Sequence, residues 1–138
     1  MILSGKEFKK RQLGVAVVGS GRMGSHRARL ASLHPAVNYL VGGDINEDQA
    51  KKLAEISKAN GYSTDNMELI NDPRVDVVIV STPEDEHRES VEAAIIAGKS
   101  VLVEKPLALT ITDGDRLSKL AEEKGCLLYT SPSPRDLR

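Results

Sequence analysis

The sequence predicts an α/β fold in which helices cover both faces of a parallel β-sheet. Short apolar runs rich in β-branched residues, typical of strands, alternate along the chain with longer stretches of helical spacing. The strand-like runs are apolar throughout, and such strands need cover on both faces. The chain has 138 residues, of which 40% are hydrophobic, and this length suits one domain with one core.

The expected elements follow one another in strand–helix order. We expect strands at 14–18, 37–44, around Tyr62, at 75–83 and at 100–104. We expect helices at 22–33, 47–60, 65–70 and 84–97, and a last one from a cap at Thr110 or Thr112 to Gly125. Glycines are expected to close two of the earlier helices, Gly61 after 47–60 and Gly98 after 84–97.

Composition points away from several classes of protein. A net charge of -1, from 19 basic and 20 acidic residues, gives no reason to expect a nucleic-acid or membrane-surface partner. Cys126 is the single cysteine, so no internal disulfide forms and a reducing compartment is favoured. The charged N-terminal residues do not suit a signal peptide, and no run approaches the ~20 apolar residues of a membrane span. We therefore expect a soluble, cytoplasmic protein.

The chain divides into a charged lead-in at 1–13, a domain at 14–125 and a tail at 126–138. The tail begins CLLYTSPSPRD, which one reading frame of a transposase-type sequencing adapter encodes. We interpret it as non-native and expect it to be irregular, with the natural protein continuing differently beyond Gly125. The alternative is a natural Ser/Pro-rich linker. The apolar letters CLLY could also imitate a strand.

Three glycines in VAVVGSGRMG (15–24) have the spacing G-x-G-x-x-G, between a strand and a helix. In that setting the pattern favours dinucleotide binding. The first glycine allows a tight turn, the second lets backbone approach the pyrophosphate, and the third allows close helix–strand packing. The candidate cofactor-binding residues here are Gly19, Ser20, Gly21, Arg22, Met23 and Gly24. A solvated position at the helix start remains open for Arg22.

An acidic residue stands about 20 positions further on, as this fingerprint requires. Asp44 ends the second expected strand, where its carboxylate can accept hydrogen bonds from the adenosine ribose hydroxyls. It would repel a 2′-phosphate, so NAD is favoured over NADP as the cofactor. The alternative is a turn aspartate before the helix at Glu47. Ile45 follows and could cover the adenine.

Further polar residues follow the next two long strands. Ser81, Thr82 and Pro83 end one of them, and Glu104, Lys105 and Pro106 end the other. In an open parallel sheet, ligands bind outside the carboxyl ends of the strands. The glycine loop, Asp44 and these two groups are therefore expected on one rim.

The motifs STPEDEH and AGKSVLVEKPLA, together with the glycine loop, resemble the N-terminal domain of the glucose–fructose oxidoreductase/inositol dehydrogenase (Gfo/Idh/MocA) family. The resemblance covers about 13–125. The family pattern has Thr-Pro after the fourth strand, a His four residues beyond, then Gly-Lys and Glu-Lys-Pro. In this sequence those motifs are Thr82-Pro83, His87, Gly98-Lys99 and Glu104-Lys105-Pro106.

The resemblance implies a doubly wound Rossmann fold and a two-domain NAD(P)-dependent oxidoreductase acting on sugars, polyols or related alcohols. Ser81, Thr82 and Pro83 would line the nicotinamide-ribose side of the cleft, and His87 would face it. Glu104 would contact the nicotinamide or its ribose, and Lys105 would point at the substrate carbon as a catalytic residue. The alternatives are a plain strand end for 81–83, a surface position for His87 and a solvent-directed lysine for Lys105.

An ammonium group is suited to that place, because oxidation of an alcohol by hydride transfer builds negative charge on the substrate oxygen. Family members carry a second domain with the substrate pocket, the catalytic acid/base and the oligomer interface. None of it stands in this sequence, so we expect cofactor binding without turnover, and a homo-oligomeric parent. The three histidines and one cysteine have no metal-site spacing, so no metal is expected. A pure nucleotide-binding module and a non-redox Rossmann protein remain the rival interpretations.

Overall fold

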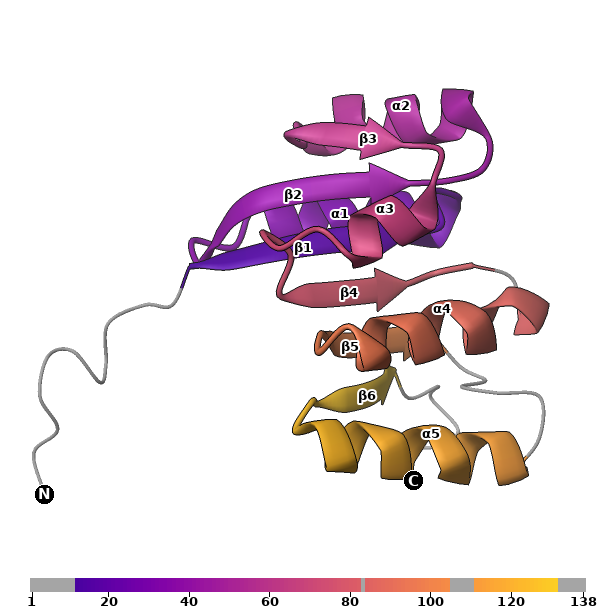
Figure 1. Ribbon diagram of the computed structural model, residues 1–138. Helices are drawn as coiled ribbons and strands as arrows, with labels where there is room; N and C mark the ends of the chain where they lie inside the picture. Colours follow the sequence, from indigo (N-terminus) through magenta and orange to yellow (C-terminus); the bar gives the residue numbers. More distant parts are fainter. Residues whose placement is uncertain (1–11, 83, 105–110, 132–138) are drawn as a thin grey trace, which may run out of the picture.

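The structure is a computed structural model that describes residues 12–82, 84–104 and 111–131. Over these residues, six strands form one parallel sheet in the order β3-β2-β1-β4-β5-β6 (Figure 1). The strands are β1 (Leu13–Val18), β2 (Val37–Gly43), β3 (Gly61–Ser63), β4 (Val77–Val80), β5 (Ser100–Glu104) and β6 (Leu128–Ser131). The helices are α1 (Arg22–Ser32), α2 (Glu47–Ser57), α3 (Asn66–Ile70), α4 (Glu84–Ile96) and α5 (Ile111–Lys124). The predicted doubly wound fold is confirmed.

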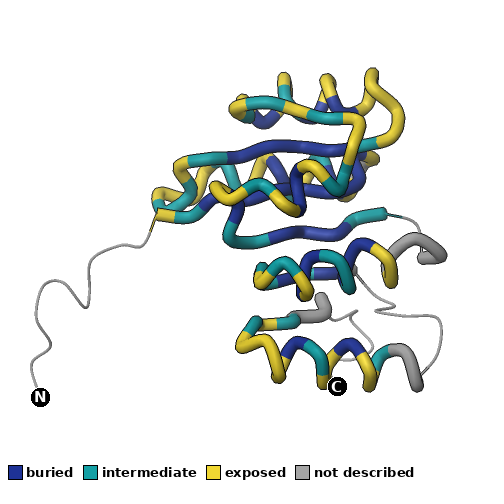
Figure 2. Tube along the Cα trace, in the orientation of Figure 1, coloured by how far each residue is buried: buried dark blue, intermediate teal, exposed yellow. Residues whose placement is uncertain are grey.

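Helices cover both faces of the sheet, as the apolar strands require. Alternate residues of β1 point to opposite faces, so Ala16 and Val18 belong to one core cluster and Val15 and Val17 to the other. The helices α3, α4 and α5 cover the first face, and α1 and α2 cover the second. Figure 2 shows that the most buried stretches are the central strands.

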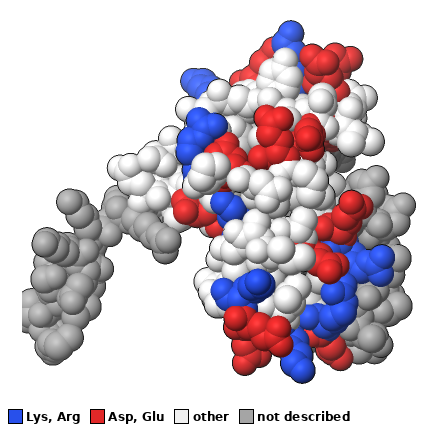
Figure 3. Space-filling view, in the orientation of Figure 1, with Lys and Arg blue, Asp and Glu red and all other residues white. Residues whose placement is uncertain are grey.

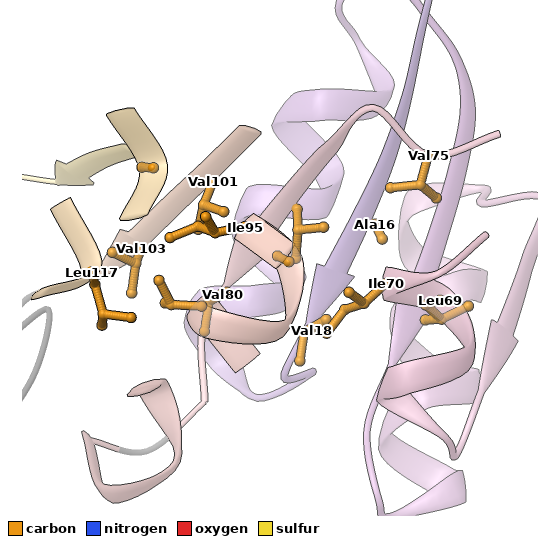
Figure 4. Packing of buried hydrophobic residues seen from close by; sticks show 14 of the residues in the cluster. Ala16, Val18, Leu69, Ile70, Val75, Val80, Ile95, Val101, Val103 and Leu117 are labelled. Carbon is orange, nitrogen blue, oxygen red and sulfur yellow. The ribbon is translucent and has the colours of Figure 1, made fainter. Parts of the chain in front are cut away.

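The larger cluster extends along the sheet from β1 and α3 to β5 and α5, and Figure 4 shows its packing. Val80, Ile95, Val103 and Leu117 are fully buried in it. Each such aliphatic side chain contributes about 1.5–3 kcal/mol when it leaves water. The described core residues are aliphatic, which agrees with an aromatic content of only 3%.

The predicted end of the second helix is wrong. α2 stops at Ser57, and Lys58 takes the left-handed conformation with φ of 56°. Asn60 is drawn to β2 instead, because its N–H donates to the Leu40 carbonyl and its Oδ1 accepts from the Leu40 N–H. Gly61 is therefore the first residue of β3 and no helix cap.

The other predicted helix ends differ less from the structure. Gly98 and Gly125 follow α4 and α5 with positive φ, as predicted, and Leu33 caps α1. Thr112 lies inside α5 and does not cap it, while Thr110 lies outside the described residues. No helix in the described ranges is long and apolar enough to cross a membrane.

The tail forms a strand where irregular chain was predicted. Residues 128–131 are β6, which pairs in parallel with β5 so that Val101 is opposite Leu128. The Val101 N–H also donates to the Leu127 carbonyl over 2.8 Å. A strand edge offers backbone groups to any extended segment, and Leu128 packs against the larger core cluster. The expectation of irregular chain from Cys126 is therefore wrong over β6.

A polar cluster fixes the loop that leads into β4. The Arg74 guanidinium donates twice to Asp72, through Nε at 3.1 Å and Nη2 at 2.9 Å, and lies 4.4 Å from the centroid of the Tyr39 ring. The Tyr39 hydroxyl donates to Asp72 Oδ2 over 3.0 Å. The hydrogen bonds from Arg74 lower the pKa of Asp72 to about 2, and burial raises the pKa of Tyr39.

We predict that Asp72→Asn lowers the free energy of unfolding at pH 7 by about 1 kcal/mol, since it weakens a charge-assisted pair whose Arg74 is exposed. The folded-state pKa of Asp72 lies below its ordinary value of 3.8. The contribution of the ionised Asp72 to the free energy of unfolding is therefore complete above pH 3.8 and is lost as the pH falls toward about 2. Urea unfolding of both proteins over this range should show their difference shrinking with falling pH. A difference that stays constant would contradict the assignment.

Candidate functional site

The glycine loop packs closely against the chain that follows β4. Gly19 has φ of +96°, and a Cβ atom added to it would lie 2.7 Å from the Ser81 carbonyl carbon and 2.8 Å from the Thr82 nitrogen. A Cβ atom on Gly24 would lie 1.8 Å from the Gly19 carbonyl oxygen, so only glycine at this position lets α1 pack this closely against the loop. Gly21 has no atom within 4 Å of the same position. The first and third glycines are thus required by packing, and the second faces open space.

Asp44 is tied to the same loop. Its Oδ2 accepts from the Ser20 N–H over 2.9 Å, and its Oδ1 accepts from the Asn46 N–H over 2.9 Å. Ser20 Oγ and the Gly19 N–H both donate to the Gly43 carbonyl, over 3.0 and 2.8 Å. An ionised carboxylate has about four acceptor positions, so two remain on Asp44 for a ligand.

The strands β1, β2 and β4 end at this rim (Figure 1). A cavity of about 480 Å³ opens there. That volume is in the range of small-molecule sites. Its lining residues come from the ends of these strands and from α2 and α3: Gly19, Ser20, Gly21, Asp44, Ile45, Gln49, Asn66, Ser81 and Thr82. A second cavity of about 350 Å³ adjoins it and shares Ile45, Asn66 and Thr82.

Three buried polar atoms at this cavity have no hydrogen-bond partner within the described residues. They are Asn66 Oδ1, Ser81 Oγ and Thr82 Oγ1. Buried polar atoms in proteins are usually paired, and an unpaired one costs about 1–3 kcal/mol. The three therefore mark a place where a polar ligand would restore missing hydrogen bonds.

The first turn of α1 also suits an anion. Its N-cap is Gly21, which has no side chain to cap the free N–H groups, and no acidic residue lies in this turn. The helix has 11 residues, so its N-terminus carries a partial positive charge. Away from this site, the face in Figure 3 shows acidic and basic side chains interspersed.

The structure brings seven of the sequence-predicted residues together in the first cavity, namely Gly19, Ser20, Gly21, Asp44, Ile45, Ser81 and Thr82. Gly24 is buried below the loop, and Met23 is 47% exposed on α1 outside the lining. The backbones of Arg22, His87 and Glu104 lie in α1, α4 and β5, and their side chains are not described. Pro83 and Lys105 lie outside the described residues.

Sequence reasoning missed Gln49 and Asn66, which also line the cavity. Asn66 follows β3, whose carboxyl end lies on the same rim, so the rule used for the other strands would have pointed to it. Gln49 carried no such signal, since it is an ordinary helix residue. Among the described residues, no group of three or more His, Cys, Asp or Glu side chains could hold a metal ion.

Comparison with known proteins agrees with this geometry. Residues 13–131, which include β6, match the family model described as an oxidoreductase family with an NAD-binding Rossmann fold. Myo-inositol 2-dehydrogenase of Thermotoga maritima is 34% identical over 117 residues, which are 84% of this chain and 35% of that protein. The chain thus spans about a third of the length of the curated relatives it matches first.

Solved structures match as well. GenD2 from gentamicin A biosynthesis, in complex with NAD, has a TM-score of 0.83 and 36% identity, covering 88% of this chain and 34% of that one. Biliverdin reductase of Synechocystis, in complex with biliverdin and NADP+, has a TM-score of 0.78 and 34% identity, covering 86% and 37%. With the glycine loop, Asp44 and the rim cavity, these matches show that the chain belongs to the Gfo/Idh/MocA oxidoreductase family, through its NAD-binding Rossmann domain.

Proposed function

We propose that this chain is the NAD-binding part of a dehydrogenase that transfers hydride between the nicotinamide and a hydroxyl carbon of a sugar, polyol or related alcohol. The observation that carries the proposal is the rim cavity, in which an open glycine loop and a fixed acidic side chain meet unpaired hydroxyls. A nucleotide-binding fragment with no turnover of its own is the second candidate, favoured by the share of the relatives' length that the chain spans.

The lining residues fit a dinucleotide. The open space at Gly21 and the uncapped N–H groups of α1 suit the pyrophosphate. The free acceptor positions of Asp44 suit the adenosine ribose hydroxyls, and Ile45 beside it offers an apolar surface to the base. The hydroxyls of Ser81 and Thr82 would then bind the nicotinamide-ribose side.

The bound nicotinamide supplies or takes the hydride, and the protein residues orient the reactants. We assign Pro83, His87 and Glu104 to the nicotinamide end of the cleft, on the strength of the family motifs that contain them. Lys105 stabilises the negative charge that develops on the substrate oxygen and holds the hydroxyl in place. We assign the acid/base group for the hydroxyl proton to the part of the relatives' length that this chain does not span, as the family resemblance implies.

Small polyols or sugars are the proposed substrates, because relatives that are 34% and 32% identical to this chain are inositol dehydrogenases. The near-neutral charge balance favours such ligands over nucleic acid or membrane surfaces. We propose a cytoplasmic location from the single cysteine, and a homo-oligomer formed by the part of the protein that corresponds to the relatives' remaining length.

The first test is the choice of cofactor. We expect calorimetric titration to show that NAD binds tighter than NADP, because the Asp44 carboxylate repels a 2′-phosphate. Asp44→Ala removes that repulsion and should bring the ratio of the NADP and NAD dissociation constants toward one. Equal affinities for the two cofactors in the unaltered protein, or tighter NADP, would show that Asp44 does not meet the ribose.

The glycine loop offers a matched pair of variants. Gly19→Ala should destabilise the fold by several kcal/mol, since its Cβ meets the Ser81 backbone and its φ is positive. Gly21→Ala should change stability by about 1 kcal/mol or less, because its φ of -72° suits alanine and nothing lies within 4 Å. It should nevertheless weaken NAD binding, since the methyl group takes the space of the pyrophosphate. Thermal unfolding and NAD titration separate the two effects, and unchanged NAD affinity in Gly21→Ala would contradict the binding role.

We also expect the 138-residue chain to bind NAD without turning over. Positioning of the substrate supplies about 7–11 kcal/mol of barrier lowering, so its loss removes at least about five orders of magnitude in rate. The measurement is NADH formation over a panel of polyols and aldoses. Enzyme-proportional NADH that disappears in Lys105→Ala would show that this chain suffices for catalysis.

A further inference from the structure

We propose that Asn66 reads the base of the bound dinucleotide and selects adenine over hypoxanthine through its side-chain amide. The inference rests on the proposed function, because it concerns the same cavity and the same ligand. It assigns a role in specificity to a residue outside the glycine loop, the ribose-binding aspartate and the residues after β4 and β5.

The place of Asn66 on the rim suits a base-reading residue. Asn66 lines both cavities, as do Ile45 and Thr82. Asp44 locates the ribose, and a base attached to that ribose lies within reach of the next residue, Ile45. The Ile45 side chain is 78% exposed and can cover one face of a flat ring. The edge of that ring then falls between the two cavities, where Asn66 stands.

The amide of Asn66 also lacks the structural role that other asparagine amides have here. Asn46 caps α2, Asn60 Oδ1 accepts from the Leu40 N–H, and Asn71 Nδ2 donates to the Met67 carbonyl. Asn66 Oδ1 is buried and has no partner among the described residues. It lies against Gly43, where an added Cβ would come within 2.5 Å of it. A rotation about χ2, a torsion with a broad profile, would turn this oxygen away from Gly43.

The chemistry of an amide matches the edge of adenine. An asparagine side chain presents one acceptor and one pair of donors side by side. Adenine presents a donor, its exocyclic amine, beside the N7 acceptor, and asparagine pairs with that edge through two hydrogen bonds. Hypoxanthine has a carbonyl oxygen in place of the amine. Two acceptors would then face each other, and the buried Oδ1 would stay unpaired.

The test compares NAD with nicotinamide hypoxanthine dinucleotide, whose base has a carbonyl oxygen in place of the amine and a proton on N1, with N7 unchanged. Calorimetric titration of the 138-residue chain should give about ten-fold tighter binding of NAD, the order expected for one bidentate amide–base pair. Asn66→Leu, of similar size, should bring the ratio of the two dissociation constants close to one, mainly by weakening NAD. Asn71→Leu is the matched control, since it makes the same change at the other end of α3, and it should keep the ratio.

Asp44→Ala separates base reading from cofactor binding. It should weaken both dinucleotides by the same factor and keep their ratio, because both carry the same ribose. Equal affinities in the unaltered chain would overturn the inference even if Asn66→Leu fails to fold, and so would an Asn66→Leu protein that still prefers NAD. In either case NAD binding itself would persist and the proposed function would stand. Absence of binding to both dinucleotides would overturn the proposed function and this inference with it.

Discussion

The rest of the site depends on how closely the glycine loop approaches the ends of β2 and β4. The Gly19 N–H and Ser20 Oγ both donate to the Gly43 carbonyl, and the Ser20 N–H donates to Asp44. On the other side, Gly19 leaves no room for a Cβ atom against Ser81. Three strand ends are thereby held in one compact rim. The positions of the Asp44 carboxylate and of the Ser81 and Thr82 hydroxyls follow from this contact.

The sheet can support such a rim because both of its faces are covered. The two core clusters use alternate residues of β1, so the strand that carries the glycine loop is packed from both sides. Its neighbours β2 and β4 pair with it in parallel register, with Val18 opposite Gly43 and Val80. The three strands therefore end at the same level. A side chain placed after any of them reaches the same cavity without a long loop.

Much of this arrangement could be predicted from sequence because it rests on local patterns. The apolar run before Gly19, the glycine spacing and the position of Asp44 are each readable within a few residues, and together they predicted most of the cavity lining. The end of α2 could not be read in this way. Asn60 leaves the helix for hydrogen bonds with Leu40, a residue 20 positions away in the sequence. The strand β6 was foreseen only as an alternative, from the apolar letters CLLY, because its pairing depends on the open edge of β5. Asn66 was missed because the strand-end rule was not applied to the short strand β3, although its unpaired oxygen could be seen only in the structure.

The unpaired atoms also bear on how the domain balances stability against binding. Among the described residues, Asn66, Ser81 and Thr82 each have one buried oxygen without a partner, and each such oxygen costs the free protein about 1–3 kcal/mol. The aliphatic clusters on both faces of the sheet offset that cost, so the rim can stay polar and open. A ligand that donates hydrogen bonds to these atoms removes this cost, and the free energy so released adds to the affinity. By linkage, the same ligand stabilises the fold in proportion to RT ln(1 + [L]/Kd). Polar groups that are a liability in the free domain thus become the source of its affinity.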